Sequence, residues 1–137
     1  MKQSCNVYFW DIALKIWRTF GNTDSEALLQ EYSKQLGFSS LSNIDLPFEK
    51  EGVVPDRELF EEWTISRPEL VRPEGWLGGD LMNLIIGQGA ITTTPVQVSN
   101  AYRTLLTGEK SAPFLSLESS DNSIEKINIS DEFVEQH

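Results

Sequence analysis

The segment from Val7 to Phe20 constrains the fold most, because its apolar side chains recur at three- and four-residue steps. These side chains belong to Val7, Phe9, Trp10, Ala13, Leu14, Ile16, Trp17 and Phe20. The spacing places them on one wide face of an α-helix. A face this wide needs other elements to cover it, so we expect a largely buried helix that ends at Gly21 and Asn22.

Two further helices are predicted from capping boxes at their starts. Thr23–Glu26 and Thr94–Gln97 each place a threonine three residues before a Glu or Gln. In this arrangement the side chains satisfy backbone N–H groups that have no partner in the first helical turn. The first of these helices is expected to run to about Leu36 and to stop at Gly37. The second is expected to stop at Gly108.

The other segments are assigned from turn residues and apolar patterning. A short helix is expected near the chain centre, a hairpin near the C-terminal end, and one more helix start after the hairpin. These correspond to Asp56–Ile65, to Phe114–Leu117 with Ile124–Ile129, and to Ser130–Glu132. The intervening segments Phe38–Pro55 and Ser66–Gly79 are expected to be loops.

Composition excludes several classes of function. The chain has 137 residues, the size of one domain, and a formal net charge of −10, which disfavours binding to nucleic acid. Its apolar runs are too short to span a membrane. Cys5 is the only cysteine, so an internal disulfide is excluded, and the only histidine, His137, is the last residue. We therefore expect no metal site and no cofactor.

A series of short motifs occurs in a recognisable order. They are Ser4–Asn6, Leu36–Phe38, Ile44–Pro47, Gly79–Asp80, Ile86–Gly89 and Thr94–Gln97. In this order and spacing they resemble the transpeptidase domain of high-molecular-weight penicillin-binding proteins, particularly the class B enzymes of cell elongation. The resemblance covers the chain from Gln3 to about Val134. It implies the α+β fold shared with serine β-lactamases, of which this chain would be a mainly α-helical part with a short β-hairpin near its C-terminus.

The resemblance also implies site residues. The family uses the motifs S-x-x-K, S-x-N and K-S/T-G, and Ser4 and Asn6 match the second. A serine hydroxyl can both donate and accept a proton, so Ser4 would pass one to the departing amine, while the Asn6 amide would position the substrate. Cys5 and the segment Gly87–Gly89 (Gly87, Gln88, Gly89) would help to shape the substrate cleft.

Each of these residues also has a structural explanation. Ser4 or Asn6 could simply cap the helix that follows. Cys5 lacks a histidine to activate its thiol, so we interpret it as a small buried apolar residue. The paired glycines of Gly87–Gly89 predict a turn with positive φ angles, which ranks ahead of a role in the cleft. Trp63 and Trp76 could line a groove for a glycan or peptide, but such tryptophans more often fix loops to the domain.

Two segments imitate the missing motifs. Ser123–Lys126 fits S-x-x-K, but it follows S-x-N instead of preceding it. Lys110–Ala112 differs from K-S-G by the alanine, and it directly follows a helix. Residues 1–137 are therefore expected to be a partial transpeptidase domain, from S-x-N to before the K-S/T-G strand. Without the nucleophile and that strand, we expect the chain alone to be inactive.

The resemblance further implies partners and a location for the parent protein. Peptidoglycan stem peptides and β-lactams would bind it, a membrane glycosyltransferase would accompany it, and an N-terminal helix would anchor it outside the bacterial cell membrane. Two alternatives stay open. The parent could be a non-catalytic or β-lactam-sensing relative that binds partners at the cell envelope, or the chain could be a helical interaction domain without chemistry.

Overall fold

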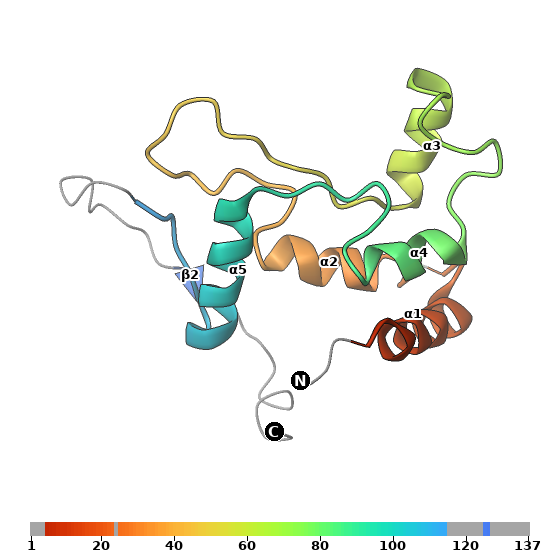
Figure 1. Ribbon diagram of the computed structural model, residues 1–137, viewed down its shortest axis with the longest axis horizontal. Coiled ribbons are helices and arrows are strands. Elements are labelled where there is room, and N and C mark those ends of the chain that lie inside the picture. The colour runs from red at the N-terminus through yellow and green to blue at the C-terminus, as the bar shows by residue number, and fades with distance from the viewer. Residues whose placement is uncertain (1–4, 24, 115–124, 127–137) are drawn as a thin grey trace. The chain divides into compact units, whose positions relative to one another are not determined.

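The computed structural model describes residues 5–23, 25–114 and 125–126. This part of the chain is mainly helical, with one antiparallel pair of two-residue strands (Figure 1). The elements are α1 (Asn6–Phe20), α2 (Leu28–Gln35), α3 (Arg57–Ser66), α4 (Gly78–Leu84), α5 (Pro95–Thr107), β1 (Glu109–Lys110) and β2 (Glu125–Lys126). The expected fold, mainly α with a short β-hairpin near the C-terminus, is confirmed. None of the described helices is both long enough and apolar enough to cross a lipid bilayer.

The chain forms two compact units, each assembled from two separate stretches of sequence. Unit 1 combines Met1–Tyr32 with Val53–Thr92, and unit 2 combines Ser33–Gly52 with Thr93–His137. Helices α1, α3 and α4 therefore belong to unit 1, whereas α5 and both strands belong to unit 2.

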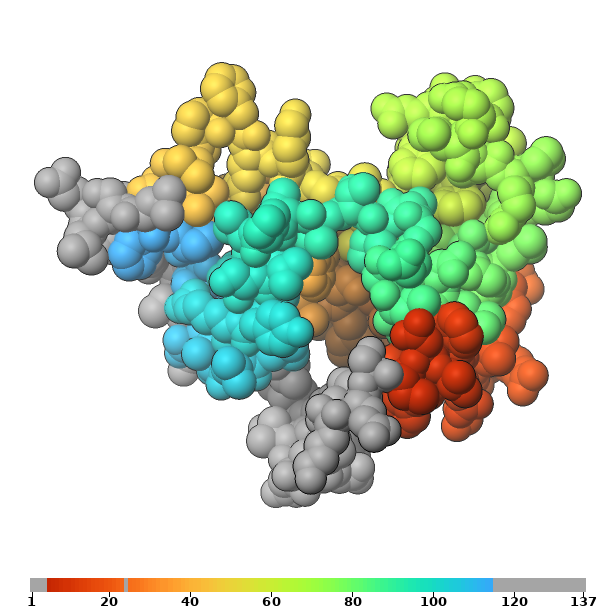
Figure 2. All heavy atoms as spheres, in the orientation of Figure 1, coloured from red at the N-terminus to blue at the C-terminus, as the bar shows by residue number. Residues whose placement is uncertain are grey.

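The core of unit 1 forms where α1 packs against α4 and where aromatic rings gather around α3. Figure 2 shows the atoms of α1, in red, lying directly against those of α4, in green. The Phe60 ring meets Trp76 edge-to-face at 5.0 Å and stacks on Trp63 at 6.0 Å. Trp76 is 2% exposed. The interpretation that Trp76 fixes its loop to the domain is therefore confirmed, whereas for Trp63 it is wrong, because Trp63 lies within α3.

Helix α1 matches its predicted range within one residue, but the expectation that it is largely buried is wrong. Ala13 is its one buried residue among those described, and Val7 is 68% exposed. The physical reason is the size of its partner: α4 has seven residues and covers only part of a wide apolar face. The remaining apolar side chains of α1 are half-buried or exposed.

Helix α2 starts later than predicted, because the Thr23–Glu26 capping box does not form. The Thr23 hydroxyl instead donates to the Phe20 carbonyl at 2.6 Å. The Glu26 carboxylate accepts from the backbone N–H of Asn22 at 2.7 Å, one residue before the predicted position. Residues 25–27 are turns, and the helix begins at Leu28. Its end is as predicted, with Gly37 at a φ of 95°.

Helices α3 and α4 differ in how well they were predicted. Helix α3 matches its predicted range within one residue, and the Asp56 side chain caps it by accepting from the Leu59 N–H at 2.9 Å. Helix α4 begins at Gly78, inside a segment expected to be a loop. The Asp80 carboxylate accepts from the Leu77 N–H at 2.9 Å, and this hydrogen bond stabilises the start of the helix. The glycines of this segment favoured a loop in the sequence analysis, so the helix start was not predicted.

Unit 2 is built around α5, whose predicted capping box is confirmed. The Thr94 hydroxyl accepts from the Gln97 N–H at 3.2 Å, and the Gln97 side chain accepts from the Thr94 N–H at 2.9 Å. The buried face of this helix is largely polar and the opposite face is apolar and exposed. The buried residues are Gln97, Asn100, Ala101 and Thr104, and the exposed ones are Val98, Tyr102, Leu105 and Leu106.

The strand pair of unit 2 corrects the predicted hairpin. Strand β1 lies at Glu109–Lys110, directly after α5, and pairs with β2 in antiparallel register. Phe114, expected in the first strand, is not in a strand. β2 falls inside the predicted second strand. The other residues of that hairpin, 115–117, 124 and 127–129, and the helix start predicted at Ser130–Glu132 lie outside the described residues.

Candidate active site

The candidate site centres on the start of α1. Cys5 is the N-cap residue of this helix, with φ −128° and ψ 99°, and its side chain makes no capping hydrogen bond. Asn6 is the first helical residue and is exposed. Ser4 lies outside the described residues. The capping interpretation is therefore wrong for Asn6, because the cap position belongs to Cys5 and the Asn6 side chain lies one residue beyond it.

Cys5 is a free, exposed cysteine. The interpretation of this residue as a small buried apolar side chain is wrong. Its position explains the difference, since a residue immediately before the first helical turn is covered only where another element packs over the helix end. A role of Cys5 in shaping the cleft stays a prediction.

The far end of α1 is held by a close contact with the start of α4. A Cβ atom at Gly78 would lie 3.1 Å from Nε1 of the Trp17 indole, closer than side chains normally approach. Glycine at this position therefore lets the two helices meet. The Arg57 guanidinium lies over the same indole, 5.8 Å from its centroid. These contacts position α1 in unit 1 from its C-terminal half.

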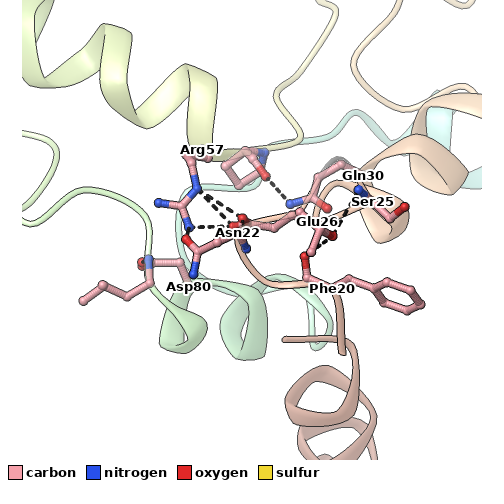
Figure 3. Close-up of polar contacts among 10 residues, drawn as sticks. Phe20, Asn22, Ser25, Glu26, Gln30, Arg57 and Asp80 are labelled. Atoms are coloured by element: carbon pink, nitrogen blue, oxygen red, sulfur yellow. Dashed lines mark hydrogen bonds and ion pairs between the residues drawn. The ribbon is translucent and has the colours of Figure 1, made fainter. Parts of the chain in front are cut away.

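A polar cluster joins the end of α1 to the start of α3 (Figure 3). The Arg57 guanidinium donates to the Glu26 carboxylate, with Nη2 to Oε1 at 2.7 Å and Nε to both oxygens at 3.2 Å. It also donates to the Asn22 side-chain oxygen at 3.3 Å. Because Glu26 additionally accepts from the Asn22 N–H, one carboxylate organises both the turn and the ion pair.

A second ion pair holds the start of α4. The Arg72 guanidinium donates to the Asp80 carboxylate at 2.5 Å, and that carboxylate also accepts from the Leu77 N–H. The side chain of Asp80 is 14% exposed, so this pair is largely shielded from solvent on the acidic side. Asp80 belongs to the Gly79–Asp80 motif, and its observed contacts organise the helix start.

The Gly87–Gly89 segment forms the turn that ends α4. Gly87 and Gly89 have φ angles of 72° and 80°, as predicted for this pair of glycines. The Gln88 N–H donates to the Asn83 carbonyl at 2.9 Å, which closes the helix end. The structural explanation of this motif is confirmed, and a contribution of these residues to a substrate cleft stays a prediction.

Two of the motif segments, Ile44–Pro47 and Lys110–Ala112, lie in unit 2. Phe48 follows Ile44–Pro47 at a φ of 64° and is 93% exposed, so the chain adopts here a left-handed turn that glycine would take more readily. In the segment that imitates K-S-G, Lys110 belongs to β1 and the Ser111 hydroxyl accepts from Arg103. Ser123 of the other imitation lies outside the described residues.

Sequence reasoning missed the residues that hold the site in place. Glu26 was assigned to a capping box, and no local signal connects it to Arg57, 31 positions later in the chain. Gly78 was assigned to a loop, although it is a close-contact residue of a helix. Within the described residues, no group of three or more His, Cys, Asp or Glu side chains is arranged to hold a metal ion.

Comparison with known proteins identifies similar sequences and folds. Residues 1–136 match the family described as "Penicillin binding protein transpeptidase domain". The chain is 32% identical over 98 residues to the peptidoglycan D,D-transpeptidase MrdA of Acinetobacter baumannii and 31% identical over 108 residues to that of Haemophilus influenzae. These alignments cover 72% and 79% of the chain.

A solved structure shows the same arrangement of elements. It is the complex between penicillin-binding protein PBP2 and MreC from Helicobacter pylori, with a TM-score of 0.68 and 26% sequence identity over 93% of this chain. The match covers 21% of the solved chain, and the matches to the two MrdA proteins cover 12% and 14% of those proteins. The chain thus corresponds to a small part of each of these relatives.

Proposed function

We propose that this chain, which belongs to the family of penicillin-binding protein transpeptidase domains, forms the middle part of a peptidoglycan D,D-transpeptidase of the elongation type. The match to the family over residues 1–136 is the observation that carries the proposal. The likeness to PBP2 and to the MrdA enzymes supports the elongation type. Residues 1–137 would extend from the S-x-N motif to before the K-S/T-G strand.

The proposed reaction is acyl transfer through a serine ester. The serine of an S-x-x-K segment, supplied by the longer parent protein, attacks the peptide carbonyl before the terminal D-alanine, and the lysine takes the proton of its hydroxyl. The C–N bond breaks, and D-alanine leaves as an amine that must gain a proton. The amine of a second stem peptide then attacks the ester, which releases the serine and forms the cross-link.

Ser4 and Asn6 are the residues of this chain proposed to act in that reaction. The Ser4 hydroxyl transfers a proton to the departing amine, and the Asn6 carboxamide holds a peptide group of the substrate. The exposed position of Asn6 at the first residue of α1 supports this role, because its amide is not used to cap the helix. Gly87–Gly89 would border the same cleft.

The parent protein would act at the outer face of the bacterial cell membrane, anchored by an N-terminal helix. Its ligands would be peptidoglycan stem peptides and β-lactams, and a membrane glycosyltransferase would supply the glycan strands. The related PBP2 of Helicobacter pylori was solved as a complex with MreC. By analogy, a protein of that kind is a further candidate partner of the parent.

Labelling with a fluorescent penicillin tests the proposal. The chain of 137 residues is expected to remain unlabelled, because neither a nucleophile nor a K-S/T-G strand is recognised in it. The parent protein, with S-x-x-K upstream and K-S/T-G downstream, is expected to be labelled. A stable adduct on the isolated chain would contradict the proposal that the parent protein supplies the nucleophile and the K-S/T-G strand. An unlabelled parent without those motifs would favour a non-catalytic relative.

Substitution of Ser4 then tests its role within the parent. Ser4→Ala is expected to slow acylation by about 100-fold, the scale of a lost general acid or base, without lowering the melting temperature by a comparable extent. Ser66→Ala is the matched control, since that hydroxyl donates only to the Glu62 carbonyl on α3. Parallel losses of stability and acylation rate in Ser4→Ala would indicate a structural role instead.

A further inference from the structure

Two adjoining pockets lie along α3, with volumes of about 260 and 340 Å³. They share the lining residues Arg57, Glu61 and Trp76, so together they form one groove. Every residue of its lining belongs to unit 1, and the groove is therefore a feature of that unit by itself. We call it the acidic groove after its carboxylates, which belong to Glu26, Asp56, Glu58, Glu61 and Glu74.

The charge of the lining is poorly balanced. Arg57 is the one cation among the described lining residues, and its guanidinium is already paired with Glu26. The side chains of Glu58, Glu61 and Glu74 form no hydrogen bond or ion pair within the described part of the chain. Glu58 and Glu61 are three residues apart on α3, a spacing at which like charges repel. The groove therefore favours a cationic ligand.

A buried amide in the first pocket provides independent support for a ligand with hydrogen-bond donors. Gln30 lines this pocket and is 1% exposed. Its side-chain nitrogen donates to the Pro55 carbonyl at 3.2 Å (Figure 3), whereas its side-chain oxygen has no partner within the described residues. Buried acceptors without a partner are rare, because they have lost their hydrogen bonds to water. A donor that enters the pocket would complete this one.

Among cations, a guanidinium group fits these acceptors best. A metal ion is disfavoured, because no group of three or more His, Cys, Asp or Glu side chains in the described residues is arranged to hold one. A guanidinium has five N–H donors in one plane, so it can bind a carboxylate and an amide oxygen together. An ammonium is more strongly hydrated than a guanidinium, so it loses more on leaving water.

The second pocket indicates that the guanidinium belongs to a polypeptide. Ile65 and Pro73 line this pocket, and the Ile65 side chain is 87% exposed, so an apolar neighbour of the arginine would have a surface to pack on. The groove as a whole is polar and charged. Permanent interfaces are mainly apolar, whereas reversible ones are about as polar as the rest of a protein surface. A separate protein that binds reversibly is therefore favoured.

We propose that the acidic groove binds an arginine-containing segment of a separate protein. The arginine guanidinium pairs with the carboxylates of Glu58 and Glu61 and donates to the Gln30 oxygen. An apolar side chain next to that arginine packs on Ile65 and Pro73. This binding does not depend on the acyl-transfer reaction, so its failure would leave the proposed function of the parent intact.

The experiment measures the binding of dye-labelled arginyl-leucyl-arginine amide to the chain of 137 residues by fluorescence anisotropy. Saturable binding is expected. The same peptide with citrulline in place of both arginines keeps its shape but loses its charge, and it is expected to bind about tenfold more weakly. Lysyl-leucyl-lysine amide is also expected to bind more weakly. Equal affinity for the citrulline peptide would overturn the proposal, and equal affinity for the lysine peptide would overturn the assignment to arginine.

The parent protein provides the second arm of this experiment. It is expected to bind the arginine peptide as tightly as the isolated chain does, because the groove is complete within unit 1. Binding by the isolated chain with none by the parent would mean that another segment of the parent occupies the groove. That result would overturn the assignment to a separate protein.

A matched pair of variants separates the groove from the general attraction of a basic peptide to a chain with a net charge of −10. Glu61→Gln is expected to weaken binding about fivefold, because Glu61 lines both pockets. Glu62→Gln makes the same change at the next position of α3, outside the lining, and should leave binding unchanged. Equal weakening by the two substitutions would contradict a specific site.

Gln30→Leu tests the buried acceptor. This substitution is expected to weaken binding about fivefold, because it removes the unpartnered oxygen while adding no charge. Its melting temperature is measured alongside, since the bond to the Pro55 carbonyl is lost as well. Unchanged binding by the folded variant would contradict the contact with Gln30. Glu61 is exposed, so the matched pair of glutamate variants decides the proposal even if Gln30→Leu does not fold.

Discussion

At the scale of single residues, Glu26 has the most consequential set of contacts in unit 1. Its carboxylate accepts from the Asn22 backbone and from the Arg57 guanidinium, and its side chain is only 13% exposed. Charge-assisted hydrogen bonds that are shielded from water are stronger than neutral ones. The link between the end of α1 and the start of α3 therefore depends on a negative charge at this position.

Substitution of this carboxylate should lower stability measurably. Glu26→Gln keeps the shape but removes the charge, and the free energy of unfolding is expected to fall by about 1–2 kcal/mol. Urea denaturation followed by circular dichroism would measure the change. Asp11→Asn is the control, because its ion pair with Lys15 is exposed on both sides and screened by solvent, so its loss should cost much less. Equal effects of the two substitutions would contradict the special role of Glu26.

At the scale of elements, two segments with the same sequence signature behave differently. Thr94–Gln97 forms both hydrogen bonds of a capping box, with Pro95 at the first helical position. Thr23–Glu26 forms neither, because the Glu26 carboxylate accepts hydrogen bonds from the Arg57 guanidinium and the Asn22 N–H instead. A local signature predicts a helix start only when no distant residue competes for the same side chain.

This difference explains how much of the fold the sequence predicts. The bounds of α1, α3 and α5 depend on apolar spacing and caps within one segment, and all three were predicted closely. The start of α4 and the place of β1 depend on Arg72, on Asp80 and on a strand partner some 15 residues distant, so local pattern could not show them. At the candidate site, the structure shows that Asn6 is exposed at the first residue of α1. Its role in catalysis stays a prediction.

The two capping segments allow a matched comparison. Thr94→Ala is expected to lower the free energy of unfolding by about 1–2 kcal/mol, since it removes the N-cap acceptor of α5. Thr23→Ala should cost about 0.5 kcal/mol or less, because its hydroxyl makes only exposed local bonds. Thermal unfolding of both variants provides the measurement. A larger loss in Thr23→Ala would mean that the first capping box operates after all.

At the scale of the whole molecule, the distribution of apolar surface is unusual. The exposed residues of α5, from Val98 to Leu106, recur at helical spacing and form one continuous apolar face, while the polar face of the same helix is buried. The exposed part of α1 adds Val7 and Tyr8. Soluble domains rarely expose such faces unless another surface covers them. We expect the remainder of a transpeptidase domain to do so in the parent protein.

The isolated chain should therefore associate with itself. Light scattering is expected to show a mass that rises with concentration, and Leu106→Lys, at a position 85% exposed, should reduce the association. Ile65→Lys makes the same chemical change on α3, where the side chain is 87% exposed and outside the α5 face, and should have little effect. A monomer at every concentration, or an equal response to both substitutions, would contradict this expectation.

The interleaving of the two units along the chain has a consequence for synthesis on the ribosome. The first stretch of unit 1 emerges long before Val53–Thr92, and the first stretch of unit 2 emerges between them. The bridge between Val53 and Thr92 closes the later stretch of unit 1. Unit 1 can thus be completed only when most of the chain has been translated, and Ser33–Gly52 must wait for α5 throughout that interval. Until then, the first stretch of each unit lacks the later stretch against which it packs in the folded unit.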